Sequence, residues 1–554
     1  MNAPLPTAAV PPTWTTGSTE VFKTGTWRAA LPRHIRAPSP CHQACPVNGD
    51  IAEWIGLART RQWRAAWDVL TRHNPFPAIA GRICHHPCES ACNRAGHDEA
   101  LSICKLERFV GDTAITEGWA FAPPAVERDG HVAVVGGGPA GLSAAFQLRR
   151  RGWRVTLYEA GAELGGLMRH GIPSYRLARD VLDAEIARIV ALGVELRCHT
   201  VLAGPDDLQR LRETHDAVFV ATGAARPKRL PQLDYRRPWV VDGAGYLAAA
   251  NAGTPPALGR RVVVVGGGSA AIDAARSARR AGHAVTLLAL ESRSQMPAQR
   301  EEVDEALDEG IALVDAAMLD AATWSDGALR LDCVRVRFEP GAERGRFSIS
   351  RVDGSGFAIA ADAVITSIGA DPDLKVFGDA LPAQGALLAA DARTQATAQA
   401  GVWAGGDVAS MARFVTEAVG MGKRAALAIH RQLLGEAAPE VDAEAVVPLA
   451  AIATWYHAPA PRAAARTLPA AARLAAGAEV QLGLEIEQAL AEGERCFSCG
   501  TCIECDNCVV VCPDLAVRRA DGGGYEVLGD YCKGCGLCVR ECPTGSMKML
   551  EETR

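Results

Sequence analysis

The sequence predicts a multidomain protein with three folded parts. They are a helical cysteine-rich domain, an α/β part with two Rossmann-like dinucleotide-binding units, and a small α+β domain with a second set of cysteines. Six of the eighteen cysteines lie between residues 41 and 104, and ten lie between 496 and 542. Two glycine-rich strand–turn–helix units lie between these groups, and at 554 residues the chain is too long for one hydrophobic core.

Composition and charge exclude several function classes. The net charge of −6 gives no reason to expect nucleic acid or an anionic membrane as partner. No stretch approaches the roughly 18 apolar residues that span a bilayer. Residues 1–39 are expected to be a disordered tail without a secretory signal. The expected localisation is therefore cytoplasmic, where clustered cysteines indicate metal or redox chemistry.

The first cysteine group predicts a helical domain over residues 40–122. Cys84, Cys88 and Cys92 are four residues apart, so on a helix they share one face. Residues 54–77 carry apolar side chains at helical spacing, and the tryptophans among them are expected in the core. Such a face indicates a metal centre, with structural zinc as the plainer alternative to iron and sulfur.

The first glycine-rich unit, residues 131–160, predicts a dinucleotide site. Gly136, Gly138 and Gly141 form G-x-G-x-x-G between an apolar strand and an amphipathic helix. They allow a tight turn and let the backbone approach a pyrophosphate at the helix N-terminus. Glu159 follows 18 residues after Gly141 and is placed to take the ribose hydroxyls.

A second unit, residues 261–291, carries Gly266, Gly268 and Ala271 as G-x-G-x-x-A. Two such units about 130 residues apart indicate a flavoprotein with a nicotinamide domain inserted into its FAD domain. We expect the FAD domain over residues 123–257 and 371–434 and the NAD(P)H domain over 258–370. Asp407, after two glycines, is expected at the flavin ribitol.

The residues expected to bind the two nucleotides lie in these units and in nearby segments of the same two domains. For FAD they are Gly136, Gly138, Pro139, Ala140, Gly141, Glu159, Gly166, Leu167, Arg169, Ala221, Thr222, Gly223, Gly406 and Asp407. For NAD(P)H they are Gly266, Gly268, Ser269, Ala271, Asp273, Glu291 and Gly369.

The C-terminal part, residues 495–554, carries the bacterial ferredoxin run twice. In such pairs the fourth cysteine ligates the other cluster. One 4Fe–4S cluster is therefore expected on Cys502, Cys505, Cys508 and Cys542, and the other on Cys532, Cys535, Cys538 and Cys512. Zinc sites need neither the third C-x-x-C step nor the C-P, so zinc is disfavoured here. Cys496 and Cys499 are surplus, as a free pair, a redox pair or ligands of an additional centre.

Three segments carry a resemblance to a known family. Residues 165–186, 266–276 and 404–408 resemble the small subunit of glutamate synthase and the N-terminal half of dihydropyrimidine dehydrogenase. The resemblance covers residues 40–435 and implies FAD in the first nucleotide fold and a nicotinamide in the second. No C-x-x-C occurs between residues 105 and 495, which argues against the disulfide reductases that share this fold.

The resemblance also extends to the cysteine-rich head. Residues 40–51, 81–92 and 102–109 are similar to the family's helical iron–sulfur domain, which implies at least one 4Fe–4S cluster. Its ligands would be Cys45, Cys84 and Cys88, with Glu107 or Cys104 as the fourth. Cys41 and Cys92 match a second family cluster, but the C-x-x-C that the family carries upstream of Cys41 is missing.

Leu290 and Glu291 stand where this family often has two arginines for the phosphate of NADP. A carboxylate there repels a phosphate and accepts hydrogen bonds from ribose hydroxyls. We therefore expect NADH in preference to NADPH, although Arg293 is near enough to favour NADPH.

Together these parts predict an NAD(P)H:acceptor oxidoreductase of the iron–sulfur flavoprotein type. It would move electrons between NADH, FAD and 4Fe–4S clusters, to or from a partner redox enzyme or ferredoxin, as one component of a hetero-oligomer. The tail is similar to the ferredoxin-like subunit of 2-oxoacid oxidoreductases, and the whole resembles the iron–sulfur flavoprotein associated with dissimilatory sulfite reductase. The alternatives are a glutamate synthase small subunit and a non-catalytic iron–sulfur scaffold or redox sensor. Residues 435–494 are expected to be a linker with a short helix.

Overall fold

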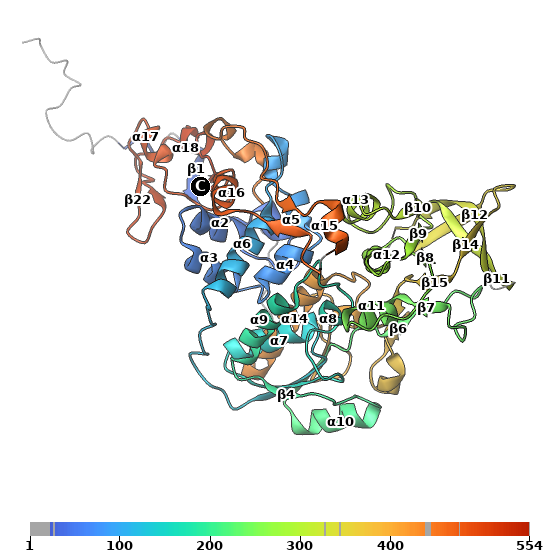
Figure 1. The fold of residues 1–554 in the computed structure, drawn as a ribbon. Coiled ribbons are helices and arrows are strands. Elements are labelled where there is room, and N and C mark those ends of the chain that lie inside the picture. Colours follow the sequence, from blue (N-terminus) through green and yellow to red (C-terminus); the bar gives the residue numbers. More distant parts are fainter. Residues whose placement is uncertain are drawn as a thin grey trace, which may run out of the picture.

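The computed structural model describes residues 23–25, 28–325, 328–342, 345–437, 445–475 and 477–552. Figure 1 shows a helical head beside the C-terminal domain, with two α/β domains below and to one side. All eighteen cysteines lie in the described part, and none forms a disulfide. Within the same part, no helix has the length and apolarity needed to cross a membrane.

The head consists of short helices around a small apolar core. Trp54, Trp67 and Leu101 are among its fully buried side chains. Its elements are α1 (Pro40–Ala44), α2 (Ile51–Arg59), α3 (Trp63–Leu70), α4 (Pro77–Ile83), α5 (Pro87–Ser90), η3 (Asn93–Gly96) and α6 (Ile103–Thr116).

The head and the FAD domain share a hydrophobic core. Phe76 and Ile79 of the head belong to the same buried cluster as the strands and helices of the first nucleotide fold. Glu185 on α9 (Arg179–Val190) accepts hydrogen bonds of 3.0 Å from the backbone N–H groups of Ala78 and Ile79, at the N-terminus of α4. A carboxylate stabilises a helix at that end, because the N–H groups there lack partners within the helix.

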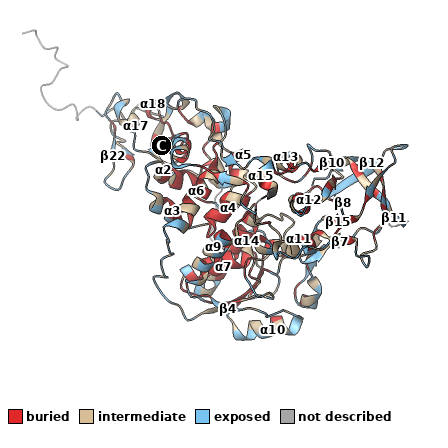
Figure 2. Ribbon diagram, in the orientation of Figure 1, coloured by how far each residue is buried: buried red, intermediate tan, exposed pale blue. Residues whose placement is uncertain are grey.

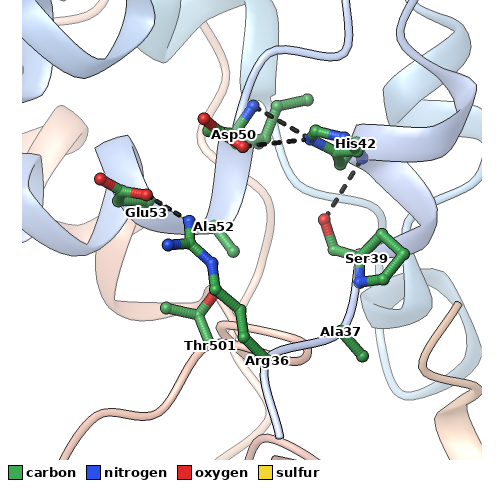
Figure 3. A pocket seen from close by; sticks show the side chains of 10 residues that line it. Arg36, Ala37, Ser39, His42, Asp50, Ala52, Glu53 and Thr501 are labelled. Atoms are coloured by element: carbon green, nitrogen blue, oxygen red, sulfur yellow. Dashed lines mark hydrogen bonds and ion pairs between the residues drawn. The ribbon is translucent and has the colours of Figure 1, made fainter. Parts of the chain in front are cut away.

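The FAD domain is built on a parallel five-stranded sheet in the order β19-β5-β2-β3-β4. Helix α7 packs on this sheet and α14 packs on α7, and both helices are largely buried in Figure 2. The elements are β2 (His131–Val135), α7 (Pro139–Arg150), β3 (Arg154–Tyr158), α8 (Leu167–His170), α9 (Arg179–Val190), β4 (Glu195–Arg197), α10 (Pro205–Thr214), β5 (Ala217–Val220), β6 (Arg226–Pro227), β16 (Ala370–Asp371), η4 (Leu374–Ala380), β17 (Ala383–Gln384), β18 (Leu387–Leu388), β19 (Val402–Ala404), η5 (Gly406–Val408) and α14 (Val415–Leu434).

The nicotinamide domain has a second parallel sheet in the order β10-β9-β8-β15-β7, next to an antiparallel β-sheet. Its boundary differs from the predicted residue 258, because β7 pairs in parallel with β15 and begins at Val240. β7 has only three residues, so its pairing with β15 in the folded protein, and not its own sequence, assigns it to this sheet. The elements are β7 (Val240–Asp242), α11 (Gly243–Asn251), β8 (Arg261–Val265), α12 (Ser269–Arg280), β9 (Ala284–Leu288), α13 (Arg300–Asp308), β10 (Ala312–Val314), β11 (Ala317–Ser325), β12 (Ala328–Pro340), β13 (Phe347–Arg351), β14 (Phe357–Ala361) and β15 (Ala363–Thr366).

The C-terminal domain combines two short helices with two antiparallel strand pairs. Its elements are α17 (Asn507–Val510), β22 (Val517–Arg519), β23 (Tyr525–Val527), α18 (Leu537–Arg540) and β24 (Met547–Glu551). β24 pairs with β1 (Ala30–His34), so residues 30–34 form a strand and the expectation of a disordered tail through residue 39 is wrong for them. The strand is held by hydrogen bonds to β24, which the sequence around residues 30–34 does not reveal. Residues 1–22, 26 and 27 of that expected tail lie outside the described residues.

The described part of residues 435–494 is packed against the other domains. It contains η6 (Leu449–Ala451), η7 (Thr454–Tyr456), β20 (Arg466–Thr467), α15 (Ala470–Ala475), β21 (Gln481–Gly483) and α16 (Ile486–Glu494). Leu484 and Ala489 join the core of the head. Glu492 is fully buried and accepts hydrogen bonds from the backbone N–H groups of Ser102 and Ala463. The segment that was expected to be a linker therefore fixes the position of the C-terminal domain against the head.

Candidate functional site

The first glycine turn joins β2 to α7. Gly136 has φ of +109°, a conformation that L-residues rarely adopt, and a Cβ on Gly141 would collide with the carbonyl oxygen of Gly136. Gly138 precedes Pro139 at the first helical position, and a Cβ at Gly138 would meet no atom within 4 Å. The N-terminus of α7 is therefore open on the side where a pyrophosphate would lie.

Glu159 follows the end of β3, beside this turn. Its Oε2 accepts a hydrogen bond of 2.8 Å from the Gly137 N–H, and its Oε1 accepts one of 2.7 Å from the Gly161 N–H. These two bonds fix the carboxylate next to the glycine turn. The arrangement fits the adenosine end of FAD, because a carboxylate there accepts hydrogen bonds from the ribose hydroxyls.

Other predicted FAD residues approach the same turn from three segments. The carbonyl of Ala221 lies against Gly136, just before Thr222 and Gly223, and Gly166 approaches Gly138. A Cβ on Gly406 would lie 3.0 Å from that of Ala140. Half of Leu167 is exposed, whereas Arg169 is bound by Asp183 at 2.5 Å.

Asp407 lies in η5, just before α14. Its carboxylate is 3.6 Å from the guanidinium of Arg413, which has φ of +57°. α14 packs tightly on α7, because Gly422 approaches the carbonyl of Ala140 so closely that a Cβ would collide with it. Asp407 is thereby held at the mouth of the first nucleotide fold. No sequence motif predicted Arg413 as its neighbour.

The second glycine turn repeats the first one. Gly266 has φ of +142°, and Gly268 precedes Ser269 and Ala271 at the start of α12. The carboxylate of Glu291 lies so close to Gly267 that a Cβ there would collide with Oε2, which matches the position of Glu159 over Gly137. Gly369, with φ of +95°, follows β15 in the next loop.

Two neighbouring charged residues have other partners. Arg293, which was considered as a phosphate ligand, forms an ion pair of 2.6 Å with Asp304. Asp273 is buried, and its carboxylate accepts a hydrogen bond of 2.7 Å from Arg176 of the FAD domain. Arg176 also binds Glu302 at 2.5 Å. The observed role of Asp273 is therefore to join the two nucleotide domains, which its place in the motif did not reveal.

In the head, Cys45, Cys84, Cys88 and Glu107 line one cavity with about 440 Å³ of space not filled by protein atoms. Cys84 and Cys88 are buried. Glu107 accepts a hydrogen bond of 2.8 Å from Asn74. Burial, and next the proximity of Cys84, raise the pKa of Glu107 to about 8. Three thiols and one carboxylate around an apolar cavity fit an iron–sulfur centre.

Cys104 is not among the side chains that line this cavity. It is buried, and its thiol is in hydrogen-bonding contact with those of Cys84 and Cys88. Its backbone N–H donates to Glu89 at 2.9 Å. Of the two expected fourth ligands, Glu107 lines the cavity, and Cys104 contacts the thiols of Cys84 and Cys88, which also line it.

The cavity also reaches the FAD domain. Sγ of Cys84 is 3.5 Å from Oγ1 of Thr416, which is in the first turn of α14 and also lines the cavity. His85 stacks on Phe414, with ring centroids 3.9 Å apart. This contact was not visible in the sequence, since the two segments are more than 300 residues apart.

The cysteines of the C-terminal domain lie in two groups. Cys508 lies near Cys502, Cys505 and Cys542 and also interacts with Cys538, which lies near Cys532, Cys535 and Cys512. The backbone N–H groups of Glu504 and Ala516 donate to the sulfurs of Cys502 and Cys512 at 3.4 and 3.2 Å. Each run therefore sends its fourth cysteine toward the other run, the arrangement expected for two cubane clusters.

The fold and these sites define a class: a two-nucleotide oxidoreductase fold flanked by cysteine-rich domains. Comparison with known families agrees. Residues 130–422 match the family described as pyridine nucleotide-disulphide oxidoreductase, and the chain belongs to this family. Residues 35–119 match the 4Fe–4S cluster domain II of dihydropyrimidine dehydrogenase, and residues 501–546 match a 4Fe–4S dicluster domain.

Several relatives cover most of this chain. The NADP(+)-dependent formate dehydrogenase subunit beta of Moorella thermoacetica is 35% identical over 73% of the chain, which spans 62% of that protein's length. The NAD-dependent dihydropyrimidine dehydrogenase subunit PreT of Escherichia coli is 32% identical over 72% of this chain and 92% of its own. The glutamate synthase [NADPH] small chain of Azospirillum brasilense is 32% identical over 74% of this chain and 88% of its own length. The resemblance to glutamate synthase small subunits and dihydropyrimidine dehydrogenases is thereby confirmed.

Proposed function

We propose that this protein is an electron-transfer subunit that moves electrons between NADH, FAD and 4Fe–4S clusters, to or from a partner redox enzyme or ferredoxin. The observation that carries this proposal is the contact between Cys84 and Thr416. It sets a cysteine-lined cavity of the head directly against α14, the helix that follows Asp407 in the FAD domain. Electrons leaving the first nucleotide fold therefore have an adjacent acceptor site.

A bound flavin accepts a hydride and releases electrons singly, which links a nicotinamide to one-electron clusters. For this task the chain supplies two open helix N-termini, at Gly138 and Gly268, to hold pyrophosphates. Glu159 and Glu291 stand beside them for the ribose hydroxyls. We assign two 4Fe–4S clusters to the C-terminal domain and at least one to the head, in a cytoplasmic setting.

NADH is the proposed nicotinamide. The carboxylate of Glu291 stands beside the glycine turn where a 2′-phosphate would come, and Arg293 is paired with Asp304. The names of relatives include both NAD- and NADP-dependent enzymes, so this preference depends on Glu291 alone.

The proposed partner docks on the C-terminal domain. Cys505 and Cys535 are exposed there, so each proposed cluster has a ligand at the surface. Val510 and Leu515 are 80% and 78% exposed on the same domain. Exposed apolar side chains beside an exposed cluster ligand suit a redox protein that binds transiently.

The test is an anaerobic visible spectrum of the purified protein during separate additions of NADH and NADPH. Bleaching of both flavin and cluster absorption by NADH supports the whole path. Bleaching of flavin alone contradicts the proposed contact between the FAD domain and the head clusters. Retention of both bands with either nucleotide contradicts the oxidoreductase function.

A glutamate synthase small chain is the second candidate, favoured by the match to 88% of the Azospirillum protein. Co-purification with a large amidotransferase subunit would support it. The ferredoxin-type segment over residues 501–546 favours the first proposal, because it offers a separate exit for electrons.

A further inference from the structure

We propose that Cys41, Cys92, Cys496 and Cys499 together bind an additional 4Fe–4S cluster, with ligands from both ends of the chain. Cys496 and Cys499 lie outside both matched iron–sulfur segments, which cover residues 35–119 and 501–546. The proposal does not depend on the direction of electron transfer or on the partner.

The four cysteines line one cavity in the interface between the head and the C-terminal domain. The cavity has about 360 Å³ of space not filled by protein atoms, counting the part open to solvent, against about 440 Å³ on the same measure for the cavity of Cys45, Cys84 and Cys88. The thiol of Cys41 lies close enough to those of Cys92, Cys496 and Cys499 to interact with them electrostatically. The remaining lining is mainly apolar and includes Ile51, Ile55, Leu101 and Ile103. Four converging thiols in an apolar cavity are the chemistry that binds an iron–sulfur cluster.

The loop of Cys496 and Cys499 has the backbone of a cluster-binding loop. In both ferredoxin runs, the residues before and after the second cysteine have positive φ: Glu504 at +55° and Asp506 at +62°, and Gly534 at +73° and Gly536 at +77°. Ser498 and Gly500 around Cys499 repeat this pattern, with φ of +50° and +70°. A non-glycine residue is strained in this conformation, so its recurrence at Ser498 and Glu504 indicates a shared structural requirement.

The sulfur atoms also have the hydrogen bonds found in the ferredoxin runs. The backbone N–H of Ser498 donates to Sγ of Cys496 at 3.4 Å, as that of Glu504 donates to Cys502 at 3.4 Å. Nδ2 of Asn93 lies 3.5 Å from Sγ of Cys499, and Oγ of Ser39 lies 3.1 Å from Sγ of Cys41. Donors aimed at sulfur stabilise the negative charge of thiolate ligands.

A buried ion-pair network holds the two halves of this site together. Arg94, two residues after Cys92, binds Asp98 at 2.5 Å and the backbone carbonyl of Arg495 at 3.0 Å. Arg495, next to Cys496, binds the same Asp98 at 3.1 Å. Arg94 and Arg495 are only 2% and 4% exposed, and Arg94 stacks on the ring of Phe497 at 4.9 Å. Cys92 and Cys496 are thereby fixed relative to each other, although about 400 residues separate them.

The position of the proposed cluster explains the missing cysteine pair upstream of Cys41. α1 places Cys41 and Cys45 one helical turn apart, and α5 does the same for Cys88 and Cys92. Each short helix therefore serves both head cavities. On the other side, Gly500 donates a backbone hydrogen bond of 2.7 Å to Thr544, two residues after Cys542. The cluster would lie between the first head cavity and the ferredoxin-type clusters, with Cys496 and Cys499 in place of the missing pair.

The test compares iron and sulfide contents of anaerobically purified protein. We expect about sixteen iron atoms per wild-type chain, four for each of four clusters. The double variant Cys496→Ala/Cys499→Ala should lose about four irons and four sulfides and keep its FAD. The control is Cys198→Ala, since Cys198 is a partly buried cysteine in the FAD domain, and it should lose none.

A second set of variants tests whether the four cysteines share one centre. Cys41→Ala/Cys92→Ala should show the same loss, and the quadruple variant should lose no more than either pair. Two independent losses that add together would overturn the proposal. A Cys496→Ala/Cys499→Ala variant that keeps all its iron would also overturn the proposal. The loss of one zinc ion from that variant, with no loss of iron, would do the same. If the variants fail to fold, wild-type iron decides: about twelve atoms per chain overturns the fourth cluster.

Discussion

Replacing Glu291 with glutamine is expected to weaken the proposed preference of this protein for NADH over NADPH. Glu291 follows β9, and its carboxylate lies against Gly267 in the second glycine turn. The adenosine ribose of a bound nicotinamide nucleotide would lie there, so the carboxylate would accept hydrogen bonds from the 2′-hydroxyl of NADH and would repel the 2′-phosphate of NADPH. Arg293 cannot screen this repulsion freely, because it is paired with Asp304.

The size of the effect follows from Coulomb's law. Two unit charges about 4 Å apart interact by about 1 kcal/mol in water and about 4 kcal/mol at the effective dielectric of a protein surface. Glu291 is partly buried, so its repulsion of the phosphate should lie between these limits. That corresponds to roughly a 5-fold to 1,000-fold discrimination against NADPH. Glu291→Gln should remove most of this factor and leave NADH use within about tenfold of the wild type.

The assay measures kcat/KM for both nucleotides with an artificial one-electron acceptor. Glu301→Gln is the matched control, because it removes an exposed carboxylate from the same domain and should leave the ratio unchanged. Burial raises the pKa of Glu291, and the neutral acid does not repel a phosphate. The ratio of kcat/KM for NADH to kcat/KM for NADPH should therefore fall in the wild type as the pH is lowered. The same ratio should change less in Glu291→Gln. A wild-type enzyme that prefers NADPH, or an unchanged ratio in Glu291→Gln, would refute the reasoning.

Three further predictions test the fold and the sites. Asp407→Ala should lower the flavin-to-protein ratio of the purified protein, measured by absorbance, whereas Asp379→Ala, which removes an exposed carboxylate of η4, should not. Arg176→Met leaves the buried carboxylate of Asp273 without its partner at 2.7 Å. The free energy of unfolding, measured by denaturant titration, should therefore fall by about 3–5 kcal/mol. The control Arg236→Met, at a side chain that is 91% exposed, should change it little. A chain that begins at residue 36 lacks β1 and exposes the edge of β24, so it should lose iron faster in air than a chain that begins at residue 23; equal rates would contradict a structural role for β1.

Local spacing carried most of what the sequence could predict. Glycine turns and cysteine runs depend on a few neighbouring residues, because the turn must fit a nucleotide and the run must surround a cube. Glu159 illustrates this, since its position at the end of the second strand was enough to place it beside Gly137. The sequence therefore predicted where in the chain each glycine turn lies, as well as the kind of turn that it forms.

Contacts between distant segments could not be predicted in this way. The strand at Ala30–His34 forms only because Met547–Glu551 lies beside it. Asp273 belongs to a nucleotide motif by sequence, yet Arg176 of another domain binds it. Cys496 was surplus by spacing, and only the fold brings it to Cys41 and Cys92. In each case the partner lies roughly 100 to 500 residues away, so no local pattern records it.

The segment before the ferredoxin-type domain shows why these distant contacts matter for function. Glu479 binds Arg82 at 2.7 Å and Arg108 at 2.8 Å in the head, and it accepts a hydrogen bond of 3.0 Å from the backbone N–H of Ala178 in the FAD domain. Arg82 and Arg108 are nearly inaccessible to solvent. Because removing one partner of such a buried group leaves an uncompensated charge, movement of this segment away from the head is costly. Successive one-electron centres need constant separations, and a segment bound to both the head and the FAD domain provides them where a flexible linker would not.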